Sequence, residues 1–417
     1  MVKEGYKETE IGVIPEDWNV KKINDIAIPK ARIGWQNLRK EEYLTNGKYL
    51  LITGTDFSDG KIVLDKCYYV SKERYIQDKN IQVSNGAVLI TKDGTLGKVA
   101  LVDGLDKPAT LNAGVFVLNN LNDNVDNRFL YQYLRTNALL KYATETSTGG
   151  TIKHLNQNVL INFCVPYPSK EEQQKIAEAL SDMDNLISSL EKLIEKKKAI
   201  KQACLQKMFP KEGERVPEMR LPGFTDAWEQ RKLGDIAEYK NGKGHEDKQS
   251  EDGKYELVNL NSISIDGGLK PSGRFIYEAE ETLLKDDLVM VLSDVGHGDL
   301  LGRVAIIHEN DRFVLNQRVA LLRVKDNTDV RFLFSIINAN QKYFKREGAG
   351  SSQLNISRDS VEDFIVNSPT GEEQKKIGVY FSNLDNLITL HQRMLEKCKK
   401  IKEGMMQQLL TGKLRLI

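Results

Sequence analysis

Apolar residues recur at alternating spacings of four and three in two long polar segments, and this pattern predicts two long α-helices with a coiled-coil seam. The first helix is expected from about Ser169 to Phe209, where Pro210 ends it, and the second from about Gly371 to Leu410. Ser169 stands just before an acidic pair, which is a typical helix start. About 40 residues at about 1.5 Å each make a rod of about 60 Å. The expected seam residues are Ile176, Leu180, Met183, Ile187, Leu190 and Ile194 in the first helix, and Ile377, Phe381, Leu384, Ile388, Met394, Leu395 and Ile401 in the second.

Both helices belong to a repeat that covers the whole chain. Their opening sequences, EEQQKI and EEQKKI, lie 201 residues apart, as do Asp184 and Asp385 further along. Nearer the start of each half, Trp18 is matched by Trp228 at an offset of 210. Because the offset changes within the globular parts and not within the helices, the halves are expected to share a scaffold and to differ in their surface loops.

Short apolar runs in each half predict buried strands. The runs 86–91 and 287–292 are bounded by Gly and Asp, which favour turns. Arg128 and Arg331 then each open a short helical pattern. The expected fold class is α+β: two β-rich α/β domains separated by two long antiparallel coiled-coil helices, with a pseudo-twofold internal repeat.

The expected domain boundaries follow from this order. They are 1–168 for the first globular domain, 169–210 for the first helix, 211–220 for a linker, 221–369 for the second globular domain, and 370–417 for the second helix and the C-terminal tail. The linker spans about 35 Å even when fully extended, so the second domain is expected near the far end of the first helix. The second helix can then find a partner for its seam only by running back along the first. This order predicts a dumbbell with a rigid two-helix spacer.

Charge and composition argue against several classes of protein. The 60 Lys and Arg against 59 Asp and Glu give a net charge of +1, so any nucleic-acid binding must depend on local patches or on partners. The four cysteines are far apart and form no C-x-x-C pair, which argues against a disulfide framework or a zinc site. The start of the chain does not resemble a signal peptide, and no apolar run is long enough to span a membrane. We therefore expect a cytoplasmic protein.

No motif for catalysis is complete in this sequence. The glycine-rich segment 296–302 is one residue too long for a dinucleotide fingerprint, and the Gly-Lys pairs are not followed by Ser or Thr as in a P-loop. His245-Glu246-Asp247 has no second histidine at helical spacing to bind a metal ion. The motifs of adenine methyltransferases and of nucleases are also missing. We therefore expect a non-catalytic protein with no metal site and no cofactor of its own.

Polar, glycine-containing loops occur in both halves. Asn, Gln, Arg and Lys offer the donors and acceptors that base edges in the major groove require, and Ser, Thr and Gly suit phosphates. Ordinary solvated turns have the same composition, so that interpretation stays open for individual residues. The candidates for contact with double-stranded DNA are Lys92, Thr95, Lys98, Thr148, Gly149, Thr151, Lys153 and His154 in the first half, and Asn316, Gln317, Arg318, Ser351, Ser352, Gln353 and Asn355 in the second.

Several segments resemble a known family along the whole chain. They are GYKETEIGVIPEDW, MFPKEGERVPEMRLPGFTDAWEQRKLGDIA, the paired EEQQKI and EEQKKI, and QQLLTGKLRLI. Together they resemble the specificity (S) subunit of type I restriction-modification systems. The resemblance implies two target-recognition domains that each read one half of a split, asymmetric DNA sequence, with the helices setting the unread gap. It also implies two methyltransferase (M) subunits and restriction (R) subunits as partners, which would bind S-adenosylmethionine, ATP and magnesium.

Other functions remain as alternatives to this one. The nearest is a stand-alone two-domain sequence-specific DNA-binding protein outside restriction. A fused methyltransferase-nuclease lacks its motifs here, and a coiled-coil scaffold would not need two domains with divergent loops. Outward apolar side chains on the helices, such as Leu193, Leu205 and Met208, predict that the isolated chain is poorly soluble or binds DNA weakly.

Overall fold

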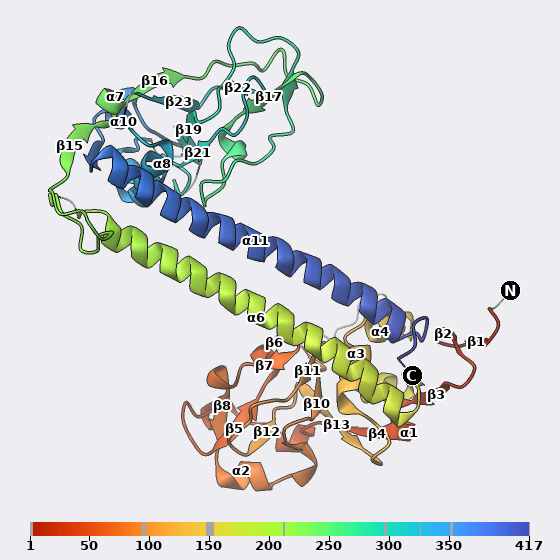
Figure 1. Ribbon diagram of the computed structural model, residues 1–417. Helices are drawn as coiled ribbons and strands as arrows, with labels where there is room; N and C mark the ends of the chain where they lie inside the picture. The colour runs from red at the N-terminus through yellow and green to blue at the C-terminus, as the bar shows by residue number, and fades with distance from the viewer. Residues whose placement is uncertain are drawn as a thin grey trace. The chain divides into compact units, whose positions relative to one another are not determined.

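A computed structural model describes residues 3–93, 97–146, 154–211, 213–295, 298–325, 327–350 and 353–416, without the side chain of Trp35. The chain forms two compact units: Met1–Leu190 with Met394–Ile417, and Glu191–Arg393. Two long helices, α6 (Lys170–Met208) and α11 (Gly371–Leu409), contribute one part to each unit (Figure 1). The first unit therefore joins segments from the two ends of the sequence.

Two four-stranded sheets form the centre of the first unit. Their strands are β4 (Ala27–Lys30), β5 (Tyr49–Ile52), β8 (Tyr68–Val70), β9 (Gln82–Val83), β10 (Val88–Thr91), β11 (Val99–Leu101), β12 (Ala109–Leu111) and β13 (Val115–Asn120). One sheet is antiparallel with the order β11-β10-β13-β4, and the other, β8-β5-β12-β9, contains the parallel pair β5 and β12. Along β10, Val88 and Ile90 lie in the core shared with the helices, and Leu89 lies in the core shared with the second sheet. Because both faces of β10 are buried, its first three residues are all apolar.

Helices and small strand pairs complete the first unit. These elements are β1 (Tyr6–Thr9), β2 (Gly12–Pro15), β3 (Asn19–Lys22), α1 (Ile23–Ile26), β6 (Phe57–Ser58), β7 (Lys61–Ile62), α2 (Lys72–Ile76), α3 (Asn127–Leu134), α4 (Ala138–Thr146), α5 (Gln157–Asn162) and β14 (Cys164–Tyr167). Asp126 caps α3 by accepting hydrogen bonds from the N–H groups of Arg128 and Phe129, which explains the helix start predicted there. Ends of both long helices also enter this core, through Leu180 of α6 and Leu409 of α11.

The second unit repeats the main elements of the first in the same order. They are β15 (Glu229–Lys232), α7 (Leu233–Ile236), β16 (Ala237–Asn241), β17 (Tyr255–Val258), β18 (Phe275–Ile276), β19 (Leu288–Val291), β20 (Ser293–Val295), β21 (Val304–Ile306), β22 (Phe313–Leu315), β23 (Val319–Val324), α8 (Val330–Ala339), α9 (Gln341–Glu347), β24 (Gln353–Asn355), α10 (Arg358–Glu362) and β25 (Ile365–Ser368). The sheet β16-β23-β19-β21 corresponds to β4-β13-β10-β11, and the parallel pair β17 and β22 corresponds to β5 and β12. The internal repeat predicted from the sequence is therefore present in the fold.

In the second unit, the two long helices run antiparallel. Lys201 of α6 forms an ion pair with Asp385 of α11, with 2.5 Å between Nζ and Oδ1. One turn further along α6, the Cys204 thiol lies 3.3 Å from the hydroxyl of Tyr380, which precedes Asp385 in α11. The residue numbers rise on one helix as they fall on the other, which defines antiparallel packing.

The first unit contains the corresponding helix pair. Asp184 of α6 pairs with Lys402 of α11 at 2.6 Å. Nearer the start of α6, the buried carboxylate of Glu172 accepts hydrogen bonds from Arg415, which follows α11, at 2.5 Å and from the indole N–H of Trp18 at 2.9 Å. The expected α+β fold class with two long antiparallel helices is therefore confirmed.

The seam differs from the prediction at two positions. Buried seam residues are Ile176, Leu180, Leu190, Ile194, Ile377, Phe381, Leu384 and Ile388, whereas Met183, Ile187 and Leu395 are partly exposed. Met394 and Ile401 were expected in the seam, and this was wrong, because they are 45% and 43% exposed. The shielded line continues through Ile388, Leu395 and Lys402 at spacings of seven. Met394 and Ile401 each stand one residue, about 100° around the helix, away from that line.

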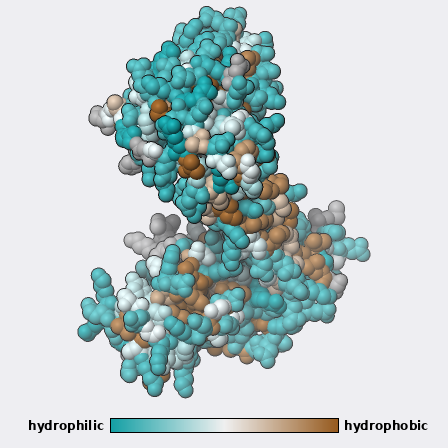
Figure 2. All heavy atoms as spheres, turned by 60° about the vertical axis from the view of Figure 1, so that its left-hand side comes forward, coloured by the Kyte–Doolittle hydropathy of each residue, from teal (hydrophilic) through white to brown (hydrophobic). Residues whose placement is uncertain are grey.

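Met208 was expected on the outer face of α6, and this too was wrong. It is 3% exposed and packs with Phe209 and Trp228 in the core of the second unit. The exposed large apolar residues of the long helices are instead Leu186, Ile200, Leu387, Leu390, Met394 and Ile401. In one view of the surface, hydrophobic patches interrupt mostly hydrophilic residues (Figure 2). Among the described residues, none of the helices combines the length and hydropathy that a membrane span requires.

Candidate nucleic-acid interface

Four loops of the first unit meet at one edge of its two sheets. β10 ends and β13 begins at this edge, where Thr91 pairs with Val115, and β4 ends there beside β13. The parallel strands β5 and β12 end together, with Ile52 opposite Leu111. The turn 112–114 joins β12 to β13 and so brings the second sheet to the same edge. We call this the first loop edge, formed by the loops after β4, β5, β10 and β12.

The loop after β10 meets the segment before α5 at the first loop edge. Oδ1 of Asp93 lies 2.6 Å from Nδ1 of His154, and the N–H of Leu155 donates to the carbonyl of Lys92 at 2.9 Å. The Lys92 ammonium lies 5.5 Å from the centre of the Phe116 ring. Two of the sequence-predicted residues, Lys92 and His154, are therefore brought to the same edge, and the carboxylate of Asp93 pairs with His154 there.

Lys98, the third described candidate of the first half, faces a separate hollow. The side chain is exposed, and it lines a cavity of about 390 Å³ together with the β6–β7 hairpin and Arg135. Its backbone N–H donates to the hydroxyl of Thr91 at 2.9 Å, which ties β11 to the end of β10. The candidates that lie outside the described residues are Thr95, Thr148, Gly149, Thr151, Lys153, Ser351 and Ser352.

A buried carboxylate supports the loop after β5 from behind. Asp56 accepts hydrogen bonds from the N–H of Thr53 at 2.7 Å and from its hydroxyl at 3.0 Å. Burial raises the pKa of Asp56. Burial, with help from the nearby Asp56 carboxylate, also raises the pKa of the Cys67 thiol to about 12. A thiol with that pKa is a poor nucleophile, so we assign this pair to the scaffold rather than to chemistry.

The second unit has a corresponding edge, the second loop edge, formed by the loops after β16, β17, β19 and β22. Asn316, Gln317 and Arg318 form its turn between β22 and β23. Arg318 adopts a left-handed backbone with φ of 67°, and its carbonyl accepts the N–H of Leu292 at 2.9 Å, which fixes the shape of the turn. The Gln317 amide donates to the carboxylate of Glu246. Among the described residues, Oδ1 of Asn316 is buried without a hydrogen-bond partner.

Gln353 and Asn355 lie at the second loop edge on β24. This strand pairs with β20, where Ser293 stands opposite Asn355, and the Gln353 amide donates to the Ser293 hydroxyl. The N–H of Ile356 donates to the carbonyl of Leu292 at 2.9 Å. This bond is the counterpart of the bond between the same two segments in the first unit. The two edges therefore share a backbone arrangement and differ in their side chains.

Sequence reasoning missed the loops that follow β4 and β16. The first of these, 31–42, carries Asn37 and Arg39, and the second, 242–248, carries Lys243 and Glu246. The sequence did contain a signal that loops in this region differ between the halves. The separation between matching residues falls from 210 near the first strand of each half to 201 at the long helices. The second loop borders a cavity of about 230 Å³, where Lys243 pairs with Glu280 at 3.0 Å.

The described residues do not contain a group of three or more His, Cys, Asp and Glu side chains that could hold a metal ion. His245, Glu246 and Asp247, which the sequence raised as a possible metal motif, lie in the polar loop 242–248. What the two edges offer is a set of amides, cations, hydroxyls and an imidazole on fixed turns. Such groups bind base edges and phosphates by hydrogen bonds.

Known proteins match this chain from end to end. A family model described as type I restriction modification DNA specificity domain matches residues 15–202 and again 225–400. The MjaVIII type I restriction enzyme specificity subunit of Methanocaldococcus jannaschii is 26% identical over 438 residues, covering 99% of this chain and 97% of the relative. The EcoBI specificity subunit of Escherichia coli is 26% identical over 201 residues, covering 47% of this chain and 42% of the relative.

Solved structures share the fold. The S subunit of a type I restriction-modification system from M. genitalium superposes with a TM-score of 0.63 at 19% identity, covering 94% of this chain and 96% of that one. A chain from a study of complex assembly and conformational transition of the type I R-M system gives a TM-score of 0.56 at 14% identity, covering 96% and 99%. The two matched domains span most of the sequence, and the duplicated edges follow the same division. This chain belongs to the type I restriction modification DNA specificity family and is a specificity subunit of type I restriction-modification systems.

Proposed function

We propose that this specificity subunit reads a split, asymmetric double-stranded DNA target, with one half-site for each loop edge. The observation that carries the proposal is the duplicated edge itself. The same two segments meet through the same kind of backbone bond in both units, at Lys92 in the first and Leu292 in the second. The side chains they present differ, with Asp93 and His154 in one unit and Gln353 in the other. A shared scaffold with different contact groups suits two half-sites of different sequence.

We further propose that methyltransferase and restriction subunits assemble on this chain. The family supports this, as does the solved relative described in terms of complex assembly of the type I R-M system. In this proposal, S-adenosylmethionine, ATP and magnesium are bound by those subunits, and this chain contributes recognition and assembly without catalysis. A net charge of +1 fits such a division, because partners that surround the duplex can neutralise many of its phosphates. In this proposal, the complex acts in the cytoplasm.

The test is to express this chain with the modification subunit from the same genome and to map methylated adenines by long-read sequencing. A split motif with two different halves is expected, and it should disappear when this chain is omitted. Methylation of a continuous or palindromic motif would contradict the proposal. Failure of the two proteins to form a complex, together with tight specific binding by this chain alone, would favour a stand-alone DNA-binding protein.

Domain exchange with a relative assigns the half-sites. Replacing residues 1–168 should change one half of the motif and leave the other half and the gap unchanged. Replacing residues 221–369 is the matched control and should change only the opposite half. If either exchange altered both halves, the assignment of one half-site to each unit would be wrong.

A further inference from the structure

The loop after β4 contributes a rigid projection to the first loop edge. Residues 31–42 contain two short 3-10 turns, Gly34–Gln36 and Lys40–Glu42. Ile33 is 50% exposed, and Asn37 and Arg39 are also exposed. Exposed loops are normally more mobile than the elements that they connect. Here both ends are held by arginines.

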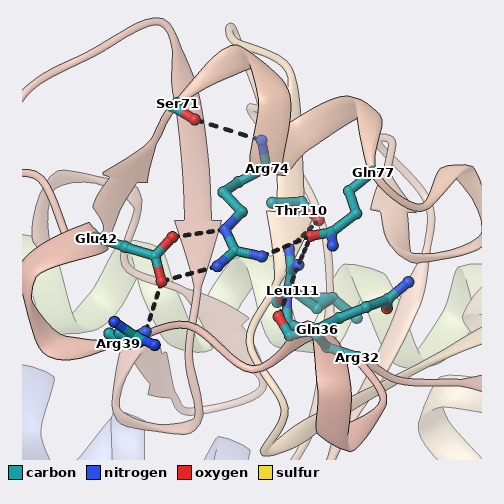
Figure 3. Close-up of polar contacts among 9 residues, drawn as sticks. All are labelled: Arg32, Gln36, Arg39, Glu42, Ser71, Arg74, Gln77, Thr110 and Leu111. Atoms are coloured by element: carbon teal, nitrogen blue, oxygen red, sulfur yellow. Dashed lines mark hydrogen bonds and ion pairs between the residues drawn. The ribbon is translucent and has the colours of Figure 1, made fainter.

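Arg32 holds the loop from inside the domain (Figure 3). It is 2% exposed, and its Nε donates to the carbonyl of Leu111 at 2.9 Å. Its terminal nitrogens lie 3.4 Å from the Thr110 hydroxyl, the Gln36 carbonyl and the Gln77 side-chain oxygen. All four acceptors are uncharged. Arg32 therefore ties the start of the loop to β12, at the end of the strand that reaches the first loop edge.

Arg74 of α2 holds the other end of the loop. It forms two hydrogen bonds to the carboxylate of Glu42, at 2.6 and 3.0 Å, in the fork geometry that suits a guanidinium. The same carboxylate accepts the N–H of Arg39 at 2.7 Å. Arg74 also donates to the side-chain oxygen of Gln77 at 3.0 Å, so Gln77 contacts both arginines (Figure 3). The hydrogen bond from Arg74 holds the pKa of Glu42 below its usual value, so the carboxylate stays ionised at neutral pH.

This arrangement is costly, and the fold does not need it. Burying a guanidinium against uncharged acceptors loses hydration, and burial lowers the pKa of Arg32 although the charges of Asp78 and Glu42 act in the opposite direction. The side-chain oxygen of Gln36 is also buried without a hydrogen-bond partner among the described residues. In the second unit the position that matches Arg32 in strand register is Gly242, so the same sheet edge forms there without a buried guanidinium. The extra anchors therefore serve the loop of the first unit rather than the sheet.

We propose that Arg32 and the Glu42–Arg74 pair are positioning residues that fix residues 33–39 as a base-reading element for the first half-site. The inference rests on the proposed function. In it, the anchored loop presents Asn37 and Arg39 to base edges. Asn and Arg are the side chains that pair in two-point fashion with adenine and guanine, and such pairing needs side chains held within a fraction of an ångström.

The experiment uses the complex with the modification subunit and measures methylation of every single-base variant of the target. Arg32→Lys and Glu42→Gln are expected to reduce discrimination at the first half-site by roughly tenfold, a fraction of what a two-point base contact supplies. Discrimination at the second half-site serves as an internal reference and should not change. Asn37→Ala with Arg39→Ala, which alters only exposed side chains, should relax the same base positions.

Lys48→Ala is the matched control. Lys48 is exposed and precedes β5, at the opposite end of that strand from the first loop edge, so its loss should leave both half-sites unchanged. The inference is overturned if folded Arg32→Lys and Asn37→Ala/Arg39→Ala complexes keep full discrimination at the first half-site, or if both half-sites relax equally. If the wild-type complex methylates no split motif, the proposed function fails first, and that outcome is distinct from the others.

Discussion

Arg220 and Glu373 offer a sharp test of how the long helices are held in the second unit. The Glu373 side chain, near the start of α11, is 0% exposed, and the Arg220 side chain is 13% exposed. Two hydrogen bonds join them, at 2.8 and 2.7 Å. Replacing Arg220 by Ala would leave a buried carboxylate without its cation. Loss of one partner from a buried ion pair costs about 3–5 kcal/mol.

We expect the lower end of that range, because Arg220 lies at the rim and water can enter after truncation. The free energy of unfolding of the second unit should fall by about 3 kcal/mol, which for a unit of this size lowers the melting temperature by about 6–12 °C. Adding Glu373→Gln should recover part of the loss, because an amide tolerates burial better than an unpaired carboxylate. The matched variant in the first unit is Arg415→Ala. It should cost less, because Glu172 keeps the hydrogen bond from Trp18 at 2.9 Å. The second carboxylate that loses Arg415, that of Asp17, is exposed to water.

Tryptophan fluorescence can follow each unit separately. Trp228 is buried in the core of the second unit, and Trp18 in that of the first. With Trp18 and Trp35 replaced by Phe, urea unfolding reports the second unit alone, and with Trp228 replaced it reports the first. A loss below about 0.5 kcal/mol for Arg220→Ala would place the pair among surface salt bridges and refute the reasoning. A loss of stability reported only by Trp18 fluorescence, and therefore confined to the first unit, would also refute it.

Two further comparisons exploit the repeat. Gly302 and Gly97 both have positive φ, but an added Cβ would lie 2.4 Å from buried Phe344 in the first case and would meet only a leucine tip at 2.5 Å in the second. Gly302→Ala should therefore cost about 2–4 kcal/mol and Gly97→Ala about 1–2 kcal/mol in urea unfolding, and equal losses would contradict this. Burial favours a higher pKa for Asp184, but hydrogen bonds from a lysine and a glutamine lower it, whereas burial raises the pKa of Asp385. The assay is thermal unfolding from pH 7 to pH 3. The stabilisation from Asp184 should be lost as the pH falls through its lowered pKa, whereas protonation of Asp385 should favour folding as the pH falls through its raised pKa. If Asn variants of the two residues changed the pH dependence of stability in the same direction, this reasoning would be wrong.

The long-range order of the fold was readable from the sequence because it repeats. The seven-residue spacing located the helices, and the shared offset located the matching strands. The prediction of seam residues was wrong at Met394 and Ile401, because the pattern alone could not show that Lys402, a charged residue, occupies the shielded line. The Lys402 ammonium pairs with the carboxylate of Asp184, which is distant in sequence, at 2.6 Å. Sequence spacing carries no information about such a partner.

The candidate site was harder to predict for a related reason. Loop composition pointed to the loop of Lys92 and to His154, which do meet at the first loop edge, but it could not show that Asp93 of that loop pairs with His154. Arg32 was not among the candidates, and only its burial against Leu111 distinguishes it from other arginines. Both features arise from residues that are distant in sequence and close in space. A pattern along the chain detects them only where it recurs, and the loops of the two edges are the part that does not recur.

The repeat offset changes within the globular parts and stays constant within the long helices, and the packing of the helix ends in the two cores explains why. The end of α11 supplies Leu409 to the core of the first unit, and the end of α6 leads into Phe209 in the core of the second. Each long helix therefore ends in the core of the unit other than the one in which it begins. A residue inserted into one helix alone would turn its end by about 100° and pull such a side chain out of its core. The loops carry no such constraint, since they end at a sheet edge open to solvent. The helices must therefore keep a common length, which holds their offset at 201, while the loops are free to diverge in length and sequence.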